Sequence, residues 1–274
     1  MQFGNHFISL SQPHVMGILN VTPDSFSDGG KHASVEKALK RALEMVEQGA
    51  TFIDIGGEST RPGAPDVSLQ EELDRTIPVI EAVARNSDCV ISIDTSKAQV
   101  MTEAVKAGAG LINDVRALQE PNALEAAANA KVPVCLMHMQ GQPRTMQHNP
   151  SYNDVVADVS AFLSDRVKAC EAKGIAKEQV LLDPGYGFGK SLEHNYALVK
   201  HLPEIMELGY PVLVGMSRKS MIGNLLNRKV DERLAGSISL ATIVAQMGAH
   251  IIRVHDVAET ADAVNIVKML NTIE

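Results

Sequence analysis

Cysteine is scarce in this chain, and the spacing of the three that are present excludes the usual cysteine-based sites. Cys89, Cys135 and Cys170 form neither a Cys-x-x-Cys pair nor a zinc-binding pattern. Cys89 and Cys135 begin apolar runs, so we expect both to lie on strands as small hydrophobic residues. A chain of 274 residues buries enough surface to be stable without disulfides. An odd, sparse set of thiols favours the reducing cytoplasm.

Long hydrophobic runs and an excess of positive charge are also missing. No apolar run approaches the roughly 18 residues that a membrane span requires. The N-terminus lacks the basic start and apolar core of a signal peptide, so we expect no export. The formal net charge of −8 argues against nucleic acid as a partner, because that binding depends on neutralising phosphates. It still allows a small anion to be held by a few local cations.

What the sequence does contain is a repeated alternation of helical and strand-like segments, without a linker or a break in composition. At Gly49, Gly108 and Gly248 a helical stretch ends in a capping glycine and a β-branched run follows. Ser34 is predicted to cap a helix whose apolar residues follow a 3.6-residue period. Short apolar runs predict eight strands: Val15–Leu19, Phe52–Ile55, Cys89–Ile93, Gly110–Ile112, Val134–Met137, Val180–Leu182, Val212–Val214 and Ile251–Val254.

Such alternation predicts parallel strands, since parallel neighbours need a crossover connection. Eight units in a chain of this length indicate an α/β fold, a (β/α)8 TIM barrel formed by one domain that spans residues 1–274. An open doubly wound sheet is the alternative. Residues up to about Pro13 precede the first unit and are predicted to form a short N-terminal hairpin at the bottom of the barrel.

Polar residues follow nearly every predicted strand. One carboxylate in such a position is usually a turn residue or a helix cap. In a barrel, however, the C-terminal ends of all eight strands converge on the face where active sites lie. Buried ionisable groups are costly unless they are paired or serve a ligand, so the whole set predicts a site. Its members are Asn20, Gly56–Arg61, Asp94, Asn113–Asp114, His138, Asp183, Ser217–Lys219 and Arg253–Asp256.

Two connections have the composition of mobile loops above the barrel mouth. Residues 22–30 contain several turn formers around one aromatic residue, Phe26, and residues 59–64 follow the second strand. We expect both connections to close over a ligand.

Seven segments, in this order along the chain, resemble the signature motifs of the dihydropteroate synthase family. They begin at about Met16 and extend to about Val264, nearly the whole chain. The one departure noticed is Tyr186, at a position where phenylalanine is commoner. The segments are Asn20–Gly30, Asp54–Gly63, Asp94–Lys97, Ile112–Asp114, Asp183–Gly185, Gly215–Ser220 and Arg253–Asp256.

The resemblance implies a transferase of folate biosynthesis. The enzyme would condense (7,8-dihydropterin-6-yl)methyl diphosphate with 4-aminobenzoate to give 7,8-dihydropteroate and diphosphate. It also implies Mg²⁺ as the cofactor, bound through the diphosphate and Asn20. Sulfonamides, which mimic the arylamine acid, are expected to compete. The resemblance further implies a cytoplasmic homodimer that binds neither nucleic acid nor membrane.

The resemblance also implies roles for individual residues of this chain. The pterin would be bound by Asp94, Asn113, Met137, Asp183, Gly215, Lys219 and Arg253. The diphosphate would be bound by Asn20, Thr60, Arg61, Arg253 and His255. The 4-aminobenzoate would be bound by Phe26, Thr60, Pro62, Phe188 and Ser217. The catalytic set would be Asp94, Lys219, Arg253, His255 and Arg61.

These roles agree with the chemistry of the residue types. A carboxylate can accept two hydrogen bonds from the amino-pyrimidine edge of a pterin. A guanidinium can stack on the ring. An arylamine is largely unprotonated at neutral pH, so no strong general base is required, and the sequence offers no convincing pair of nucleophile and base.

Three alternatives remain at the level of sequence. A corrinoid-linked methyltetrahydrofolate methyltransferase would share the pterin edge chemistry, but would not need the loops that carry Phe26 and Arg61. A non-catalytic paralogue would bind pterin and form no product. A purely structural protein leaves the ring of ionisable residues unexplained.

Overall fold

A computed structural model describes residues 1–22, 30–59, 66–141, 146 and 149–273. A short antiparallel hairpin of β1 (Gln2–Phe3) and β2 (His6–Phe7) precedes a sheet of eight parallel strands. The strands of the sheet are β3 (His14–Asn20), β4 (Phe52–Gly56), β5 (Val90–Asp94), β6 (Leu111–Asp114), β7 (Val134–Met137), β8 (Val180–Asp183), β9 (Leu213–Val214) and β10 (Ile251–Val254). All eight predicted strands are therefore confirmed, with ends displaced by at most two residues.

The strands close into a barrel. Neighbours along the chain pair in parallel from β3 to β8, and β10 pairs with both β3 and β9. A parallel bridge between Leu182 and Val212 joins the remaining two edges. This closure confirms the TIM barrel and excludes the open sheet.

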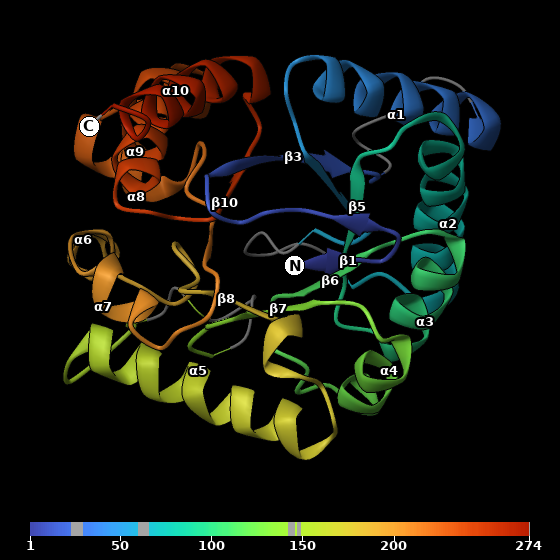
Figure 1. Ribbon diagram of the computed structural model, residues 1–274, viewed down its shortest axis with the longest axis horizontal. Coiled ribbons are helices and arrows are strands. Elements are labelled where there is room, and N and C mark those ends of the chain that lie inside the picture. Colours follow the sequence, from blue (N-terminus) through green and yellow to red (C-terminus); the bar gives the residue numbers. More distant parts are fainter. Residues whose placement is uncertain (23–29, 60–65, 142–145, 147–148, 274) are drawn as a thin grey trace.

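Helices cover the outside of the barrel, as Figure 1 shows. The α1 helix begins at Gly30, four residues before the cap predicted at Ser34, so that cap prediction is wrong. Every helix of the described residues is too short or too polar to span a membrane. The helices are α1 (Gly30–Glu47), α2 (Leu69–Asn86), α3 (Ala98–Ala107), α4 (Ala123–Ala130), α5 (Val155–Ala172), α6 (Leu192–Lys200), α7 (Leu202–Met206), α8 (Ser220–Leu226), α9 (Leu234–Gln246) and α10 (Val257–Leu270), with 3₁₀ turns η2 (Lys177–Gln179) and η3 (Val230–Glu232).

The bottom of the barrel interior is filled by one apolar side chain from each strand. The N-terminal hairpin covers this layer, since Phe3 is fully buried and its ring lies edge-on to Phe52, 5.0 Å between centroids. The predicted hairpin at the barrel bottom is thereby confirmed. The members of the layer are Met16, Phe52, Val90, Leu111, Cys135, Leu181, Leu213 and Ile251.

The next inward-facing layer is predominantly polar. Side chains alternate across a strand, so the residue two positions after each member of the apolar layer also faces the interior. Those positions hold Ile18, Asp54, Ser92, Asn113, Met137, Asp183, Gly215 and Arg253. The strand period thus places a polar layer directly above an apolar one, toward the C-terminal mouth of the barrel.

Candidate active site

Arg253 connects the carboxylates of the polar layer. Its Nε donates to Asp54 Oδ2 at 2.6 Å, and a terminal guanidinium nitrogen donates to Asp94 Oδ2 at 2.8 Å. Asn113 Nδ2 also donates to Asp54 Oδ2, at 3.2 Å. Four strands of the barrel, β4, β5, β6 and β10, therefore contribute to one hydrogen-bonded cluster.

Burial sets the protonation chemistry of this cluster. Burial raises the pKa of Asp94 to about 7; Arg253 opposes this shift, whereas Asp54 adds to it. Burial also raises the pKa of Asp183, although the nearby Lys219 ammonium opposes the shift. Burial lowers the pKa of Arg253, but the adjacent Asp54 and Asp94 carboxylates together raise it by a larger amount. The net pKa is raised, so the guanidinium stays charged. The site therefore holds a permanent cation beside one carboxylate, Asp94, that ionises near neutral pH.

Lys219 lies between the polar layer and the loop after β8. Its Nζ donates to the Tyr186 carbonyl at 2.6 Å and lies 4.5 Å from the centroid of the Phe188 ring. Burial lowers the pKa of Lys219 to about 8, although the Asp183 carboxylate opposes the shift. Asp183 in turn accepts a hydrogen bond from the Gly185 N–H at 2.7 Å.

Ser217 and His255 form a pair at the ends of β9 and β10. The Ser217 hydroxyl accepts from the His255 backbone N–H and lies 3.1 Å from His255 Nδ1. Ser217 is only 6% exposed. The hydroxyl is therefore enclosed and in contact with the imidazole.

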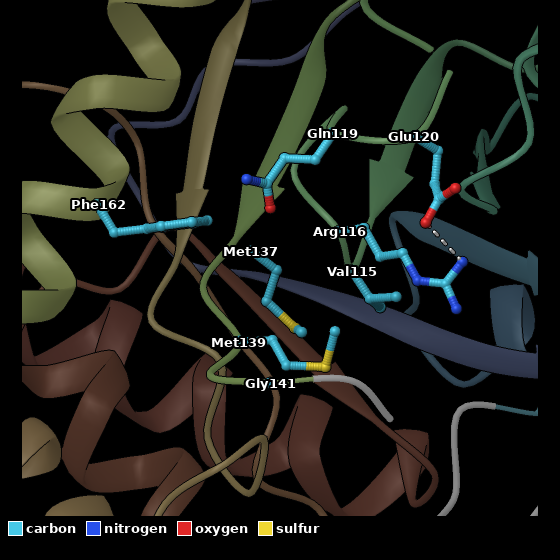
Figure 2. A pocket seen from close by; sticks show the side chains of 8 residues that line it. All are labelled: Val115, Arg116, Gln119, Glu120, Met137, Met139, Gly141 and Phe162. Carbon is cyan, nitrogen blue, oxygen red and sulfur yellow. Dashed lines mark ion pairs between the residues drawn. The ribbon is translucent and has the colours of Figure 1, made fainter. Parts of the chain in front are cut away.

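Met137 lies at the edge of a small hollow of about 60 Å³. In Figure 2 the side chains of Val115, Met137 and Met139 lie close together, and Arg116 is paired with Glu120 at 3.2 Å. The lining of this hollow is mixed, because the polar side chains of Arg116, Gln119 and Glu120 lie beside the apolar ones. Its lining residues are Val115, Arg116, Gln119, Glu120, Met137, Met139, Gly141 and Phe162.

Comparisons with known proteins agree with this geometry. Residues 16–255 match the family model described as pterin binding enzyme. The Escherichia coli (strain K12) dihydropteroate synthase is 59% identical over 261 residues, which cover 95% of this chain and 93% of that protein. The chain belongs to the dihydropteroate synthase family.

Solved structures of dihydropteroate synthases have the same fold. The Yersinia pestis enzyme in a sulfonamide drug complex is 57% identical, has a TM-score of 0.95, and the match covers all of both chains. The Xanthomonas albilineans enzyme in complex with 7,8-dihydropteroate is 48% identical, with a TM-score of 0.91, and the match covers 99% of this chain and 98% of that one. The chain is thus a transferase with the fold of its family.

The structure brings most of the predicted dihydropteroate synthase residues together. Asp94, Asn113, Met137, Asp183, Gly215 and Arg253 share the interior of the barrel, and Lys219, Phe188, Ser217 and His255 lie on the loops that follow β8, β9 and β10. Asn20 ends β3, on the same inward face as Met16. Four predicted residues, Phe26, Thr60, Arg61 and Pro62, lie outside the described residues, as do most of the two predicted loops.

Three residues that the sequence placed at the mouth have other surroundings. His138 lies on the outer side of β7, where its ring is 5.0 Å from that of Phe162 on α5. Asp114 accepts hydrogen bonds from the backbone N–H groups of Arg116 and Leu118, so it organises the turn after β6. Asp256 accepts from Arg218 Nε at 2.9 Å. These side chains stabilise loops, because strand alternation turns positions 114 and 138 away from the interior.

Asp54 is the site residue that sequence reasoning missed. It is fully buried within β4 rather than after the strand, and it holds Arg253 and Asn113. A signal was present, since a carboxylate two residues after Phe52 shares its inward face.

Proposed function

We propose that this chain forms 7,8-dihydropteroate and diphosphate from (7,8-dihydropterin-6-yl)methyl diphosphate and 4-aminobenzoate. The observation that carries the proposal is the polar layer inside the barrel, where Asp54, Asp94 and Asp183 surround Arg253 and Lys219. A pterin has a neutral, flat ring with several N–H donors along one edge. Such an edge complements buried carboxylate oxygens, which are costly to leave without a donor.

Each member of the layer has a complementary group on the pterin. Asp183 accepts from the 2-amino group and the neighbouring ring N–H, a two-point interaction that one carboxylate can make. Asn113 offers both a donor and an acceptor to the same edge. Lys219 donates to the ring carbonyl, Arg253 stacks on the ring face, and Met137 provides an apolar contact from β7.

The reaction is a substitution at the exocyclic carbon of the pterin. The bond between that carbon and the diphosphate oxygen breaks, and its electron pair leaves with the diphosphate. The electron-rich pterin spreads the positive charge that remains, and the Asp94 carboxylate stabilises it in an enclosed site where electrostatic effects are strong. The arylamine nitrogen then forms the new C–N bond and loses a proton.

The diphosphate is held at the mouth by His255 and, from the segments outside the described residues, by Thr60 and Arg61. Among the described residues there is no group of three His, Cys, Asp or Glu side chains placed to form a metal cage. Asn20 supplies one amide oxygen at the end of β3, and one protein oxygen suits Mg²⁺ that is otherwise bound by phosphates and water. When bound there, Mg²⁺ would neutralise charge on the leaving diphosphate.

The 4-aminobenzoate ring packs on Phe188, beside Lys219. Phe26, Thr60 and Pro62, which lie outside the described residues, stay predicted contacts of the same ring. Ser217 was predicted to bind its carboxylate, but that hydroxyl is enclosed and already engaged by His255. Ser220 is exposed at the first residue of α8, directly after Lys219. We therefore transfer the carboxylate contact to Ser220 and assign Ser217 to the orientation of His255.

The direct test incubates the purified protein with Mg²⁺, the dihydropterin diphosphate and labelled 4-aminobenzoate. Labelled dihydropteroate is the expected product, and a sulfonamide should compete with 4-aminobenzoate. Pterin binding without product would support the non-catalytic paralogue instead. Asp183→Ala should abolish pterin binding, because it removes the carboxylate that accepts from the ring edge.

A homodimer is supported by the surface of the last three helices. Large exposed apolar side chains concentrate on α8, α9, α10 and the turns beside them, which lie together in Figure 1. Monomers rarely expose such a concentration. Sedimentation analysis of the wild type and of Ile266→Glu, whose side chain is 63% exposed, tests this pairing. The residues are Leu225, Leu226, Val230, Leu234, Ile243, Ile266, Met269, Leu270 and Ile273.

The cysteines are consistent with the cytoplasmic location that we expect. Cys89, Cys135 and Cys170 are all buried and unpaired. Free thiols of this kind persist in a reducing compartment.

A further inference from the structure

Lys190 is a buried lysine that the proposed mechanism does not use; burial lowers its pKa to about 7, although the Asp183 carboxylate opposes the shift. It is 4% exposed and lies in the loop between β8 and α6. Its Nζ donates to the carbonyl oxygens of Gly185 at 2.8 Å and Phe188 at 3.0 Å, and it lies 2.9 Å from His138 Nδ1. Burying a lysine amino group costs free energy, so we expect a lysine that is kept in the interior to have a role there.

The loop between β8 and α6, which contains Lys190, packs closely against the chain that follows β7. Gly185, Gly187 and Gly189 have positive φ angles of 71°, 80° and 63°. A Cβ at Gly185 would lie 1.8 Å from the His138 carbonyl oxygen, and one at Gly189 would lie 2.4 Å from that of Gln140. Only glycine allows such a close approach at these positions. The Lys190 amino group lies at this contact and makes hydrogen bonds to both segments.

Two groups on the same loop form part of the active site. The Tyr186 carbonyl accepts from Lys219, and the Phe188 ring lies under the Lys219 ammonium. Lys190 bonds to the carbonyl of the residue before Tyr186 and to that of Phe188 itself. It therefore fixes the backbone on both sides of the segment that presents these groups.

We propose that Lys190 is a positioning residue that holds the loop after β8 against the chain that follows β7, so that the Phe188 ring is oriented for 4-aminobenzoate. Lys190 does not touch the substrates. The inference rests on the proposed function, because it concerns the second substrate of that reaction.

The protonation state of His138 agrees with this role. Burial, with a further contribution from Lys190, lowers the pKa of His138 to about 3. The imidazole is then neutral at working pH, and its Nδ1 can accept a hydrogen bond from Lys190. Tyr152 adds to the same contact, since its hydroxyl donates to the Gly189 carbonyl at 2.7 Å.

The test compares Lys190→Met and Lys190→Gln with Lys200→Met, which changes an exposed lysine at the end of α6. Lys190→Met should raise KM for 4-aminobenzoate about tenfold, while the Kd of the pterin diphosphate changes less than about threefold. Lys190→Gln keeps two N–H donors and should recover part of the loss. Lys200→Met should behave as the wild type.

The results separate the possible explanations. Equal losses for both substrates, or an unchanged KM for 4-aminobenzoate in a folded Lys190 variant, would overturn the positioning role. If Lys190→Met does not fold, KM for 4-aminobenzoate and the Kd of the pterin diphosphate are measured for Lys190→Gln instead, and the same outcomes apply. A wild-type protein that binds pterin but forms no product would overturn the proposed function, and with it this inference.

Discussion

The role of Asp54 leads to a prediction that runs against simple expectation. Asp54→Asn removes a negative charge that holds Arg253 and Asn113 and keeps nearly the same shape. The variant should be less stable, yet it should keep its activity to lower pH than the wild type. The reason is that the Asp54 carboxylate helps to raise the pKa of Asp94.

Both effects can be sized from the contacts. Removing one partner of a buried ion pair costs about 3–5 kcal/mol. Arg253 keeps Asp94, so we expect a loss near the lower end of that range. Two unit charges about 5 Å apart interact by about 3 kcal/mol at an effective dielectric constant of about 20. One pKa unit corresponds to about 1.4 kcal/mol, so the pKa of Asp94 should fall by about two units.

The sign of the activity change follows from the role of Asp94. Its carboxylate must be ionised to stabilise the pterin cation, so kcat/KM of the wild type should fall as the pH drops through about 7, the pKa of Asp94. Without the Asp54 charge, the carboxylate stays ionised at lower pH. The acidic fall in kcat/KM should therefore move to lower pH, although the maximum is reduced because Arg253 is held less firmly.

The assay measures kcat/KM for the pterin diphosphate from about pH 5 to pH 9, and urea unfolding gives the change in stability. Ser92→Ala is the matched control. Ser92 pairs with Asp54 across the two strands and is buried, but it is uncharged. Ser92→Ala should therefore leave the pH of the acidic fall in kcat/KM unchanged. If the acidic fall in kcat/KM of Asp54→Asn occurs at the wild-type pH or at a higher pH, the proposed coupling between Asp54 and Asp94 is refuted.

Three further predictions concern the loops around the layer. Lys219→Arg should move the alkaline fall in kcat/KM, expected near the Lys219 pKa of about 8, to higher pH, because arginine stays protonated. Ser220→Ala should raise KM for 4-aminobenzoate, whereas Ser217→Ala should mainly lower kcat; the reverse pattern would restore the original assignment of Ser217. Gly185→Ala should lower the free energy of unfolding by about 3 kcal/mol or more, since its Cβ would lie 1.8 Å from a backbone oxygen. Gly215→Ala, with its nearest contact at 3.7 Å, should fold normally, and denaturant unfolding compares the two.

The strands were predictable because their signal is local. Each is a short apolar run, and the glycine that precedes several of them marks the end of a helix. Val134–Met137 and Ile251–Val254 were predicted with their observed ends. The start of α1 was not, because a capping serine such as Ser34 resembles a serine inside the first turns of a longer helix.

The misplaced site residues share one cause. A polar residue that follows a strand can be seen in the sequence, whereas the side to which its side chain points depends on its position relative to the strand. Asp54 lies inside β4 and faces inward, and His138 follows β7 and faces outward. Lys190 gave no sequence signal, because its partners are mostly backbone carbonyls contributed by two separate segments.

The charge balance of the interior explains why this barrel selects a pterin. Three carboxylates, Asp54, Asp94 and Asp183, face two cations, Arg253 and Lys219, so the layer has more acceptors than its own donors satisfy. A ligand ring without N–H donors would leave a buried carboxylate unpaired, and rejection on this ground is typically strong. A negatively charged ring would add repulsion. A neutral, donor-rich heterocycle can enter, provided that its anionic tail stays at the mouth, where His255 lies.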